Sequence, residues 1–219
     1  MSELVIFDLD GTIIKGQSQH IFLKYLFEKR VVGLFFYIKI TFWFIFYKLG
    51  LVGDPKGVME YVFSFLKGMN AGDMDEIIDS FLSERIKEFI FPEIIDIINK
   101  HKAESRGLVI VSNSPDIFVK KIAGLLGIEN YIATRLEIVG DKFAGKILGD
   151  IVYGKNKVNF AKEFSVKNNF DLSNSYAYAD HISDLDLLLM VSKPCAVNPD
   201  KLLLKEAKKR NWPVLIFKK

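Results

Sequence analysis

Short hydrophobic runs stand at the start of the chain and at intervals through its second half, and helical patterns separate most of them. Each run is four to six residues long and is bounded by polar residues, glycine or proline. This pattern is typical of strands that are buried on both faces. Its alternation with helices predicts an α/β fold, a doubly wound Rossmann-like parallel sheet, in which ligands bind beyond the carboxyl ends of the strands. The runs are residues 4–7, 107–112, 175–179, 194–197 and 213–217.

A long stretch without any convincing strand pattern interrupts this alternation. Residues 15–91 show only helical periodicity, and strands and helices resume at about Pro92. The simplest architecture is a helical cap domain at residues 15–91, inserted after the first strand of a Rossmann-like core that consists of residues 1–14 and 92–219. Ser114 stands before a proline, which predicts the start of a core helix with Ser114 as its N-cap.

The cap contains an unusually aromatic segment. Residues 31–47 hold eight aromatic side chains and a single charge, Lys39. The segment is marginally short for a transmembrane helix, and a single span there would separate the first strand from the rest of the sheet. We therefore expect it to form part of the core of the cap. Peripheral contact with a membrane and an apolar substrate groove are the alternatives, because large apolar patches usually mark binding surfaces.

Composition narrows the class of protein. The chain has 219 residues and a net charge of +3, and its lysine-rich places fit the solvated face of a helix, so we expect no nucleic acid partner. The single cysteine, Cys195, cannot form an internal disulfide, and the N-terminal residues show no secretory leader pattern. These features predict a cytoplasmic protein, membrane-associated if the aromatic segment touches a bilayer. They leave the oligomeric state open.

Two carboxylates follow the first predicted strand. Asp8 and Asp10 are two positions apart, and placing them together at the end of a buried strand is costly unless a cation neutralises them. Phosphoryl transfer uses such a pair, in which one carboxylate attacks phosphorus and the other exchanges protons with the leaving alcohol and with water. Gly11 allows a sharp turn that exposes backbone amides to phosphate oxygens. A strand that simply ends in a capped turn is the structural alternative.

Later segments add three features that would reach the same edge of the sheet. Ser112 ends the second strand with a hydroxyl that can bind a phosphoryl oxygen, just before the N-terminus of a helix. Lys157 opens another helix and could neutralise charge on the transferring group, with Lys155 as its competitor. Asp180 and Asp184 follow a further strand and supply the hard oxygen ligands that suit Mg²⁺.

These groups, in this order, resemble the four motifs of the haloacid dehalogenase superfamily. The matching positions are Asp8-x-Asp10-x-Thr12, Ser112, Lys157 and Asp180-x-x-x-Asp184. A helical cap between the first and second motifs is similar to the phosphoserine-phosphatase-like branch. The resemblance implies that Mg²⁺ is held by the carboxylates of Asp8 and Asp180 and the backbone carbonyl of Asp10, with Asp184 orienting water or the lysine. It implies a phosphate-binding set of Gly11, Thr12, Ser112, Asn113 and Lys157.

One position departs from the pattern of that branch. Phosphoserine phosphatases carry a glutamate shortly after the first motif, where it meets the substrate ammonium, and this chain has Gln17 there. Neutral Gln17 can donate and accept hydrogen bonds but cannot form an ion pair, so phosphoserine is a doubtful substrate. We therefore assign Gln17 to substrate specificity.

The expected activity is hydrolysis of a small-molecule phosphomonoester by a magnesium-dependent phosphatase. Asp8 would form an aspartyl-phosphate, and Asp10 would act as general acid and base. The alternatives are a phosphotransferase that uses the same intermediate, and a membrane-associated phosphatase that acts on a lysophospholipid-like phosphate. A membrane-bound protein that keeps an inactive site is the non-enzymatic alternative.

Overall fold

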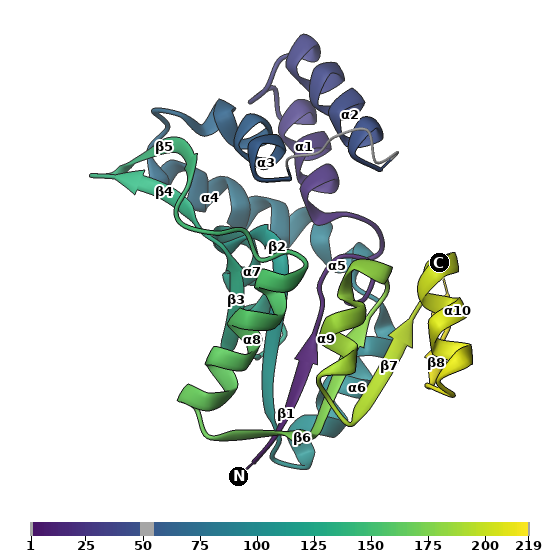
Figure 1. Ribbon diagram of the computed structural model, residues 1–219. Coiled ribbons are helices and arrows are strands. Elements are labelled where there is room, and N and C mark those ends of the chain that lie inside the picture. Colours follow the sequence, from purple (N-terminus) through teal and green to yellow (C-terminus); the bar gives the residue numbers. More distant parts are fainter. Residues whose placement is uncertain (1, 49–54, 219) are drawn as a thin grey trace.

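The computed structural model describes residues 2–48 and 55–218 and shows a parallel sheet with helices on both faces (Figure 1). Six strands lie in the order β3-β2-β1-β6-β7-β8, and all their pairings are parallel. The predicted α/β fold with a Rossmann-like sheet is therefore confirmed. The strands are β1 (Ser2–Phe7), β2 (Gly107–Pro115), β3 (Asn130–Thr134), β6 (Phe170–Ala179), β7 (Lys193–Val197) and β8 (Val214–Leu215).

Alternate residues of the central strands face opposite layers of helices. In β1, Val5 and Phe7 belong to a core shared with α6 (Pro92–Ala103) and α7 (Asp116–Leu125). Leu4 and Ile6 point into the second core, on the other face of the sheet. Because both faces are buried, the strands read in the sequence as continuous apolar runs. The helices of the second core are α8 (Lys155–Lys167), α9 (Leu185–Leu189) and α10 (Lys201–Lys209).

Helices from residues 18–89 lie beyond the carboxyl ends of the strands, at the top of Figure 1. A hairpin of β4 (Leu136–Val139) and β5 (Lys142–Ile147) reaches up from the core and packs on them. The Gly68 amide donates to the Phe143 carbonyl at 2.9 Å, and the Phe143 amide donates to Met69 at 3.0 Å. The helices are α1 (Ser18–Glu28), α2 (Leu34–Lys48), α3 (Pro55–Phe63), α4 (Ala71–Phe81) and α5 (Lys87–Phe89), with short turns at 64–66 and 82–86.

The aromatic segment forms α2, and among its described side chains, residues 34–42, those on one side pack as expected for cap core. Ile40 is fully buried, and Phe36 and Tyr37 pack against the cap. Phe35 and Phe42 point outward and are exposed. The side chains of residues 43–47 lie outside the described part of the structure. Among the described residues, no helix is both long and apolar enough to cross a membrane.

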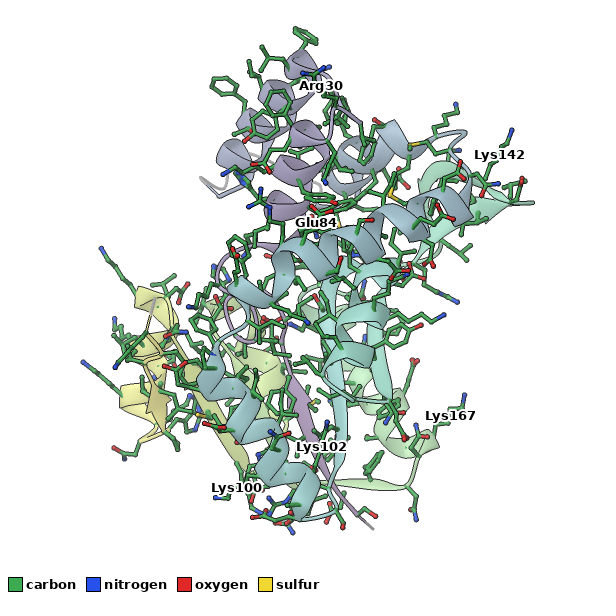
Figure 2. All side chains as sticks on the ribbon, turned by 180° about the vertical axis from the view of Figure 1, so that it is seen from behind. Arg30, Glu84, Lys100, Lys102, Lys142 and Lys167 are labelled. Atoms are coloured by element: carbon green, nitrogen blue, oxygen red, sulfur yellow. The ribbon has the colours of Figure 1, made fainter. Side chains whose placement is uncertain are left out.

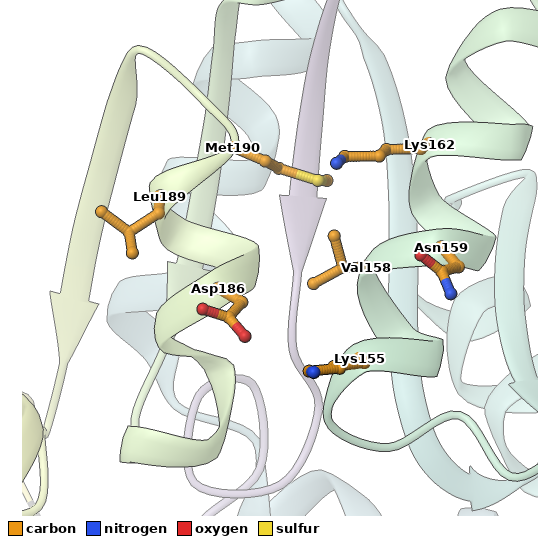
Figure 3. Close-up of a pocket in the computed structure, with 7 residues that line it drawn as sticks. All are labelled: Lys155, Val158, Asn159, Lys162, Asp186, Leu189 and Met190. Atoms are coloured by element: carbon orange, nitrogen blue, oxygen red, sulfur yellow. The ribbon is translucent and has the colours of Figure 1, made fainter.

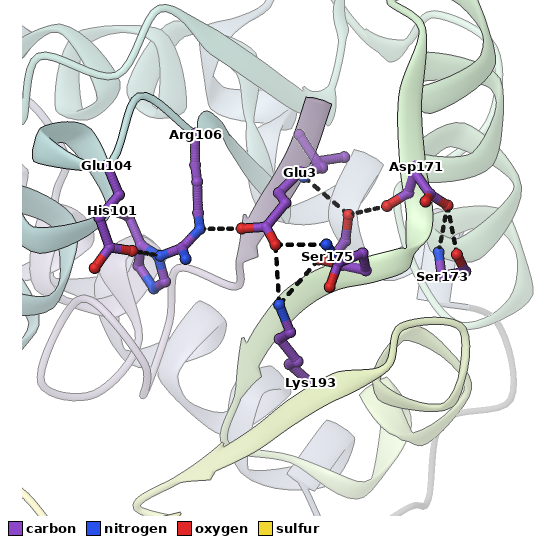
Figure 4. Close-up of polar contacts among 10 residues, drawn as sticks. Glu3, His101, Glu104, Arg106, Asp171, Ser173, Ser175 and Lys193 are labelled. Atoms are coloured by element: carbon purple, nitrogen blue, oxygen red, sulfur yellow. Dashed lines mark hydrogen bonds and ion pairs between the residues drawn. The ribbon is translucent and has the colours of Figure 1, made fainter. Parts of the chain in front are cut away.

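A polar network fastens the amino ends of the strands, at the opposite end of the sheet from the cap (Figure 4). Glu3 of β1 forms ion pairs with Arg106 and with Lys193, the latter at 3.0 Å. The buried His101 ring bonds to the Tyr178 hydroxyl at 2.8 Å and to Arg106 at 2.9 Å. These contacts tie β1, β6 and β7 to α6.

Candidate active site

The loop after β1 brings the first carboxylate to the edge of the sheet. Asp8 is buried, and its amide donates to the Tyr178 carbonyl of β6 at 2.9 Å. Gly11 has a φ of +89°, and a Cβ built on it would lie 2.0 Å from Asp180 Oδ2. Only glycine therefore allows this loop to pass so close to the loop that follows β6.

A buried lysine joins two of the carboxylates. Lys157, in the first turn of α8, donates from Nζ to Asp8 Oδ1 at 2.6 Å and pairs with Asp184 Oδ1 at 2.9 Å. Burial alone would lower the pKa of Lys157, but the carboxylates of Asp184 and Asp8 outweigh it and hold this pKa above its ordinary value. Lys155 is exposed on the outside of the same helix, so Lys157 is the lysine that reaches the site.

Asp8, Asp180 and Asp184 form a cluster in which one oxygen from each lies within 4.8 Å of the others. Burial, followed by repulsion from Asp8 and Asp184, raises the pKa of Asp180 to about 9. Burial also raises the pKa of Asp8 to about 7, despite the attraction of Lys157. The single ammonium thus leaves the cluster short of positive charge. Carboxylate oxygens at this spacing suit a hard divalent cation such as Mg²⁺, so these residues fit the metal that the sequence predicts.

The second carboxylate of the first motif is held by two serines. Asp10 Oδ1 accepts from the Ser18 amide at 2.6 Å, and Asp10 Oδ2 accepts from the Ser114 hydroxyl at 2.7 Å. Burial raises the pKa of Asp10, while these hydrogen bonds counteract the increase. Ser114 Oγ also lies 3.0 Å from Ser18 Oγ and accepts from Gln19 Nε2 at 3.4 Å. Asp10 therefore accepts hydrogen bonds from two separate elements, from Ser114 of β2 and from Ser18 at the start of α1.

The prediction that Ser114 caps a helix is wrong. Strand β2 continues through Pro115, which is the N-cap of α7 and provides no side-chain cap. The Ser114 hydroxyl is turned to Asp10 instead. Ser18 and Ser114 are thus two site residues that the sequence reasoning missed. Ser114 stands before a proline and has the same appearance as an ordinary helix start. Ser18 contacts Asp10 through its backbone amide, which no side-chain pattern signals.

The remaining predicted residues lie around this centre in different ways. Ser112 is buried, and its hydroxyl accepts from the Ser114 amide at 3.1 Å. Thr12 is buried, and its Oγ1 has no partner among the described residues, as expected for a group that bonds to a bound ligand. The Asn113 side chain turns to β3, where its Oδ1 accepts from Thr134 at 3.3 Å. Gln17 is exposed at the N-terminus of α1.

A hollow in the surface lies apart from these residues. A cavity of about 410 Å³ lies between α8 and α9, and Lys155, Lys162 and Asp186 line its polar side (Figure 3). None of the three clustered carboxylates lines this hollow. It is open to solvent and separate from the residues just described.

The fold and the buried carboxylates together define a Rossmann-like core with a carboxylate site that suits a divalent cation. A sequence model of the haloacid dehalogenase-like hydrolases matches residues 5–189, from the first motif to beyond the last. The chain therefore belongs to the haloacid dehalogenase-like hydrolase family, and the resemblance stated from the motifs is confirmed.

Similar proteins place it among the phosphatases of that family. It is 33% identical to a probable phosphatase of Mycobacterium tuberculosis, over 96% of this chain and 74% of that protein. It is 30% identical to a histidinol-phosphatase of Neisseria meningitidis serogroup C over the full length of both. The solved structure of a phosphoserine phosphatase, a phospho-aspartyl intermediate analogue, shares the fold with a TM-score of 0.71 at 18% identity, covering 100% of this chain and 94% of that one. The chain is thus an enzyme of the phosphoserine-phosphatase-like branch.

Proposed function

We propose that the chain is a magnesium-dependent phosphatase that hydrolyses phosphate monoesters of small molecules through an aspartyl-phosphate on Asp8. The surroundings of Asp8 carry this proposal. Its carboxylate is buried, lies 2.6 Å from the Lys157 ammonium and clusters with two further carboxylates. A carboxylate nucleophile and a cation-binding cluster beside it are the two parts that this reaction needs.

The carboxylates of Asp8 and Asp180, with the backbone carbonyl of Asp10, would hold Mg²⁺. The raised pKa of Asp8 and of Asp180 supports this assignment, because burial and then repulsion between the carboxylates raise these values, and a divalent cation would offset both effects. When bound, Mg²⁺ would supply charge neutralisation for the nucleophile and for the transferring phosphoryl group. Asp184 contacts Lys157, which supports a role in orienting that lysine.

The two carboxylates of the first motif would divide the chemistry. An Asp8 oxygen forms a bond to phosphorus as the bond from phosphorus to the alcohol oxygen breaks, and protonated Asp10 gives its proton to that oxygen. Asp10, now ionised, then takes a proton from water, whose oxygen attacks phosphorus and releases Asp8 and inorganic phosphate. Burial raises the pKa of Asp10 and supports the first role, and hydrogen bonds from Ser18 and Ser114 favour the ionised form needed for the second.

The phosphoryl oxygens would be received by Lys157, by the hydroxyls of Thr12 and Ser112, and by backbone amides of the loop at Gly11. The unpartnered Thr12 hydroxyl supports this placement. The side chain of Asn113 is engaged with Thr134, so its contribution would come from its backbone amide. Such an arrangement stabilises charge that grows on the phosphoryl group in the transition state.

Gln17 would set the preference among substrates. It is exposed and directly precedes Ser18, whose amide contacts Asp10. Without a carboxylate at Gln17, an ammonium on the substrate would find no ion-pair partner there. We expect phosphoserine to be a poor substrate, and a panel that includes histidinol phosphate, sugar phosphates and lysophosphatidic acid to contain better ones.

Replacement of the nucleophile tests the proposal. Asp8→Asn should lower the magnesium-dependent release of phosphate from an aryl phosphate by at least roughly a thousandfold, because the amide cannot attack phosphorus. Asp186→Asn is the matched control, since Asp186 is exposed and lines the outer hollow. Circular dichroism should show both variants folded. Full activity in folded Asp8→Asn would refute the mechanism.

Trapping the intermediate distinguishes this route from direct attack by water. Acid quenching during turnover should leave a phosphoryl group on the peptide that contains Asp8, removable by hydroxylamine, and mass spectrometry should find none in Asp8→Asn. Added alcohols should not divert the group from water to a new ester. Preferential ester formation would instead identify a phosphotransferase.

A further inference from the structure

One side of α2 presents a row of apolar side chains to solvent. We call this row the outer face of α2, and its members recur three or four positions apart, so they lie on one side of the helix. Phe35 is 82% exposed, Leu34 58% and Phe42 55%. The outer face consists of Leu34, Phe35, Ile38 and Phe42 of α2, together with Val31 just before the helix.

The other side of this helix is already used for packing. Phe36 meets Phe65 with ring centroids 5.5 Å apart, and Tyr37 stacks on Phe27 at 4.6 Å. A helix that is apolar all round is normally buried all round, so the outer face calls for an occupant. Its exposed side chains amount to roughly 500 Å², which is near the upper end for a monomer and typical of a functional patch.

Charge around the outer face identifies that occupant. Residues 29–53 contain four basic residues and no acidic one, and among the four Lys29 is paired with Glu84 at 2.8 Å. Arg30 is exposed at the end of the cap, beside the start of α2 (Figure 2), and Lys39 lies in the helix with its ammonium 4.8 Å from the Tyr61 ring centroid. Glu28, the acid just before this stretch, is paired with Arg85 at 2.7 Å. Apolar side chains flanked by cations of one sign complement an anionic lipid surface.

A second copy of the chain fits this surface less well. A stable dimer buries about 800 Å² on each partner, which exceeds the outer face. A two-fold contact would also bring the same patch of each copy together, so Arg30 and Lys39 of both copies would gather in one interface without an acidic side chain from residues 29–53 to balance them. We propose that the outer face of α2 docks reversibly on a bilayer that contains anionic phospholipid, with Phe35 and Phe42 in the interface and Arg30 and Lys39 at the headgroups.

Vesicle flotation of the full chain tests this proposal. We expect the protein to float with vesicles of phosphatidylglycerol and phosphatidylcholine, and to bind vesicles of phosphatidylcholine alone roughly fivefold more weakly for each cation engaged. The double variant Phe35→Ser and Phe42→Ser should bind the anionic vesicles at least roughly tenfold more weakly. Val166→Ser is the matched control, because Val166 is 81% exposed on α8, away from the cap.

A charge variant tests the electrostatic part separately. Arg30→Glu should weaken binding to anionic vesicles at least roughly fivefold, while Lys167→Glu, an exposed position on α8, should not. All variants should keep their activity on a small soluble aryl phosphate. Equal binding by the wild type and the double serine variant would overturn the proposal. The proposal would also be overturned if light scattering showed that the wild type is a dimer, that the double variant is a monomer, and if the wild type bound no vesicles.

Discussion

Lys157→Met removes the positive charge that two buried carboxylates share, while keeping a long unbranched side chain in its place. The ammonium lies 2.6 Å from Asp8 Oδ1 and 2.9 Å from Asp184 Oδ1, and all three side chains are buried. The variant therefore leaves both carboxylates without this cation. Without metal, we expect the folded state to lose stability even though the methionine fills most of the space.

The magnitude follows from two opposing terms. At an effective dielectric constant of about 20, each contact to Lys157 is worth on the order of 6 kcal/mol before desolvation. Keeping the ammonium out of water costs several kcal/mol, which cancels much of that attraction. Removal of one partner from a buried ion pair typically destabilises a protein by about 3–5 kcal/mol. That loss is a large fraction of the free energy of unfolding of a typical domain, which is roughly 5–15 kcal/mol.

Urea unfolding in EDTA, followed by circular dichroism, measures this loss. Lys155→Met is the matched control, because Lys155 is exposed in the same turn of α8, and it should change stability by no more than about 0.5 kcal/mol. Addition of Asp184→Asn to Lys157→Met removes one unpaired carboxylate and should recover part of the loss. If Lys157→Met and Lys155→Met proved equally stable, the buried ion pairs of Lys157 would contribute nothing measurable to the free energy of unfolding, and this reasoning would be refuted.

Three further predictions concern other parts of the molecule. Ser114→Ala should lower kcat by about 10- to 100-fold with less effect on KM, because Asp10 loses one of its charge-assisted hydrogen bonds, and the pH profile of kcat should shift upward. Gly11→Ala should abolish activity, because its Cβ would meet Asp180 at 2.0 Å. Gly16 has a similar φ of +88°, but a Cβ there would meet nothing within 4 Å, so Gly16→Ala should cost only the backbone strain. Burial, with the nearby Arg106, lowers the pKa of His101 from its ordinary value of 6.5 to about 4. Between these two pH values the unfolded chain therefore binds more protons than the folded protein. Stability should therefore fall by about 1–2 kcal/mol as the pH drops from about 6.5 to 4, and His101→Gln should flatten this part of the curve measured by denaturation.

The sheet could be predicted where both of its faces are buried. Continuous apolar runs such as residues 107–112 admit few interpretations, because helices cover them on both sides. Strands β3, β4 and β5 were not predicted. They lie at the sheet edge or on the cap, where polar and apolar residues mix, and the hairpin depends on contacts such as Phe143 with Met69 that join segments far apart in the chain.

The sequence also allowed several residues of the candidate site to be placed at one edge of the sheet, for a related reason. Asp8, Ser112 and Asp180 each stand at or just after the end of an apolar run, and parallel strands bring such ends to one edge. The choice between Lys155 and Lys157 could not be made from the sequence, because both stand in the first turn of the same helix. Their exposure in the folded chain separates them.

Asp10 shows why some of the site could not be found in the sequence at all. Its two oxygens are bound from opposite parts of the molecule, by Ser114 of β2 and by the amide of Ser18, where α1 begins. Hydrogen bonds at the proposed general acid thus depend on how the first cap helix sits on the core, and a rotation of α1 away from β2 would break the Ser18 contact while leaving the Ser114 contact in place. Because hydrogen bonds to the ionised form lower the pKa of a carboxylic acid, such a rotation would raise the pKa of Asp10. The position of the cap and the acidity of Asp10, the group that would protonate the leaving alcohol in the proposed mechanism, are therefore physically coupled.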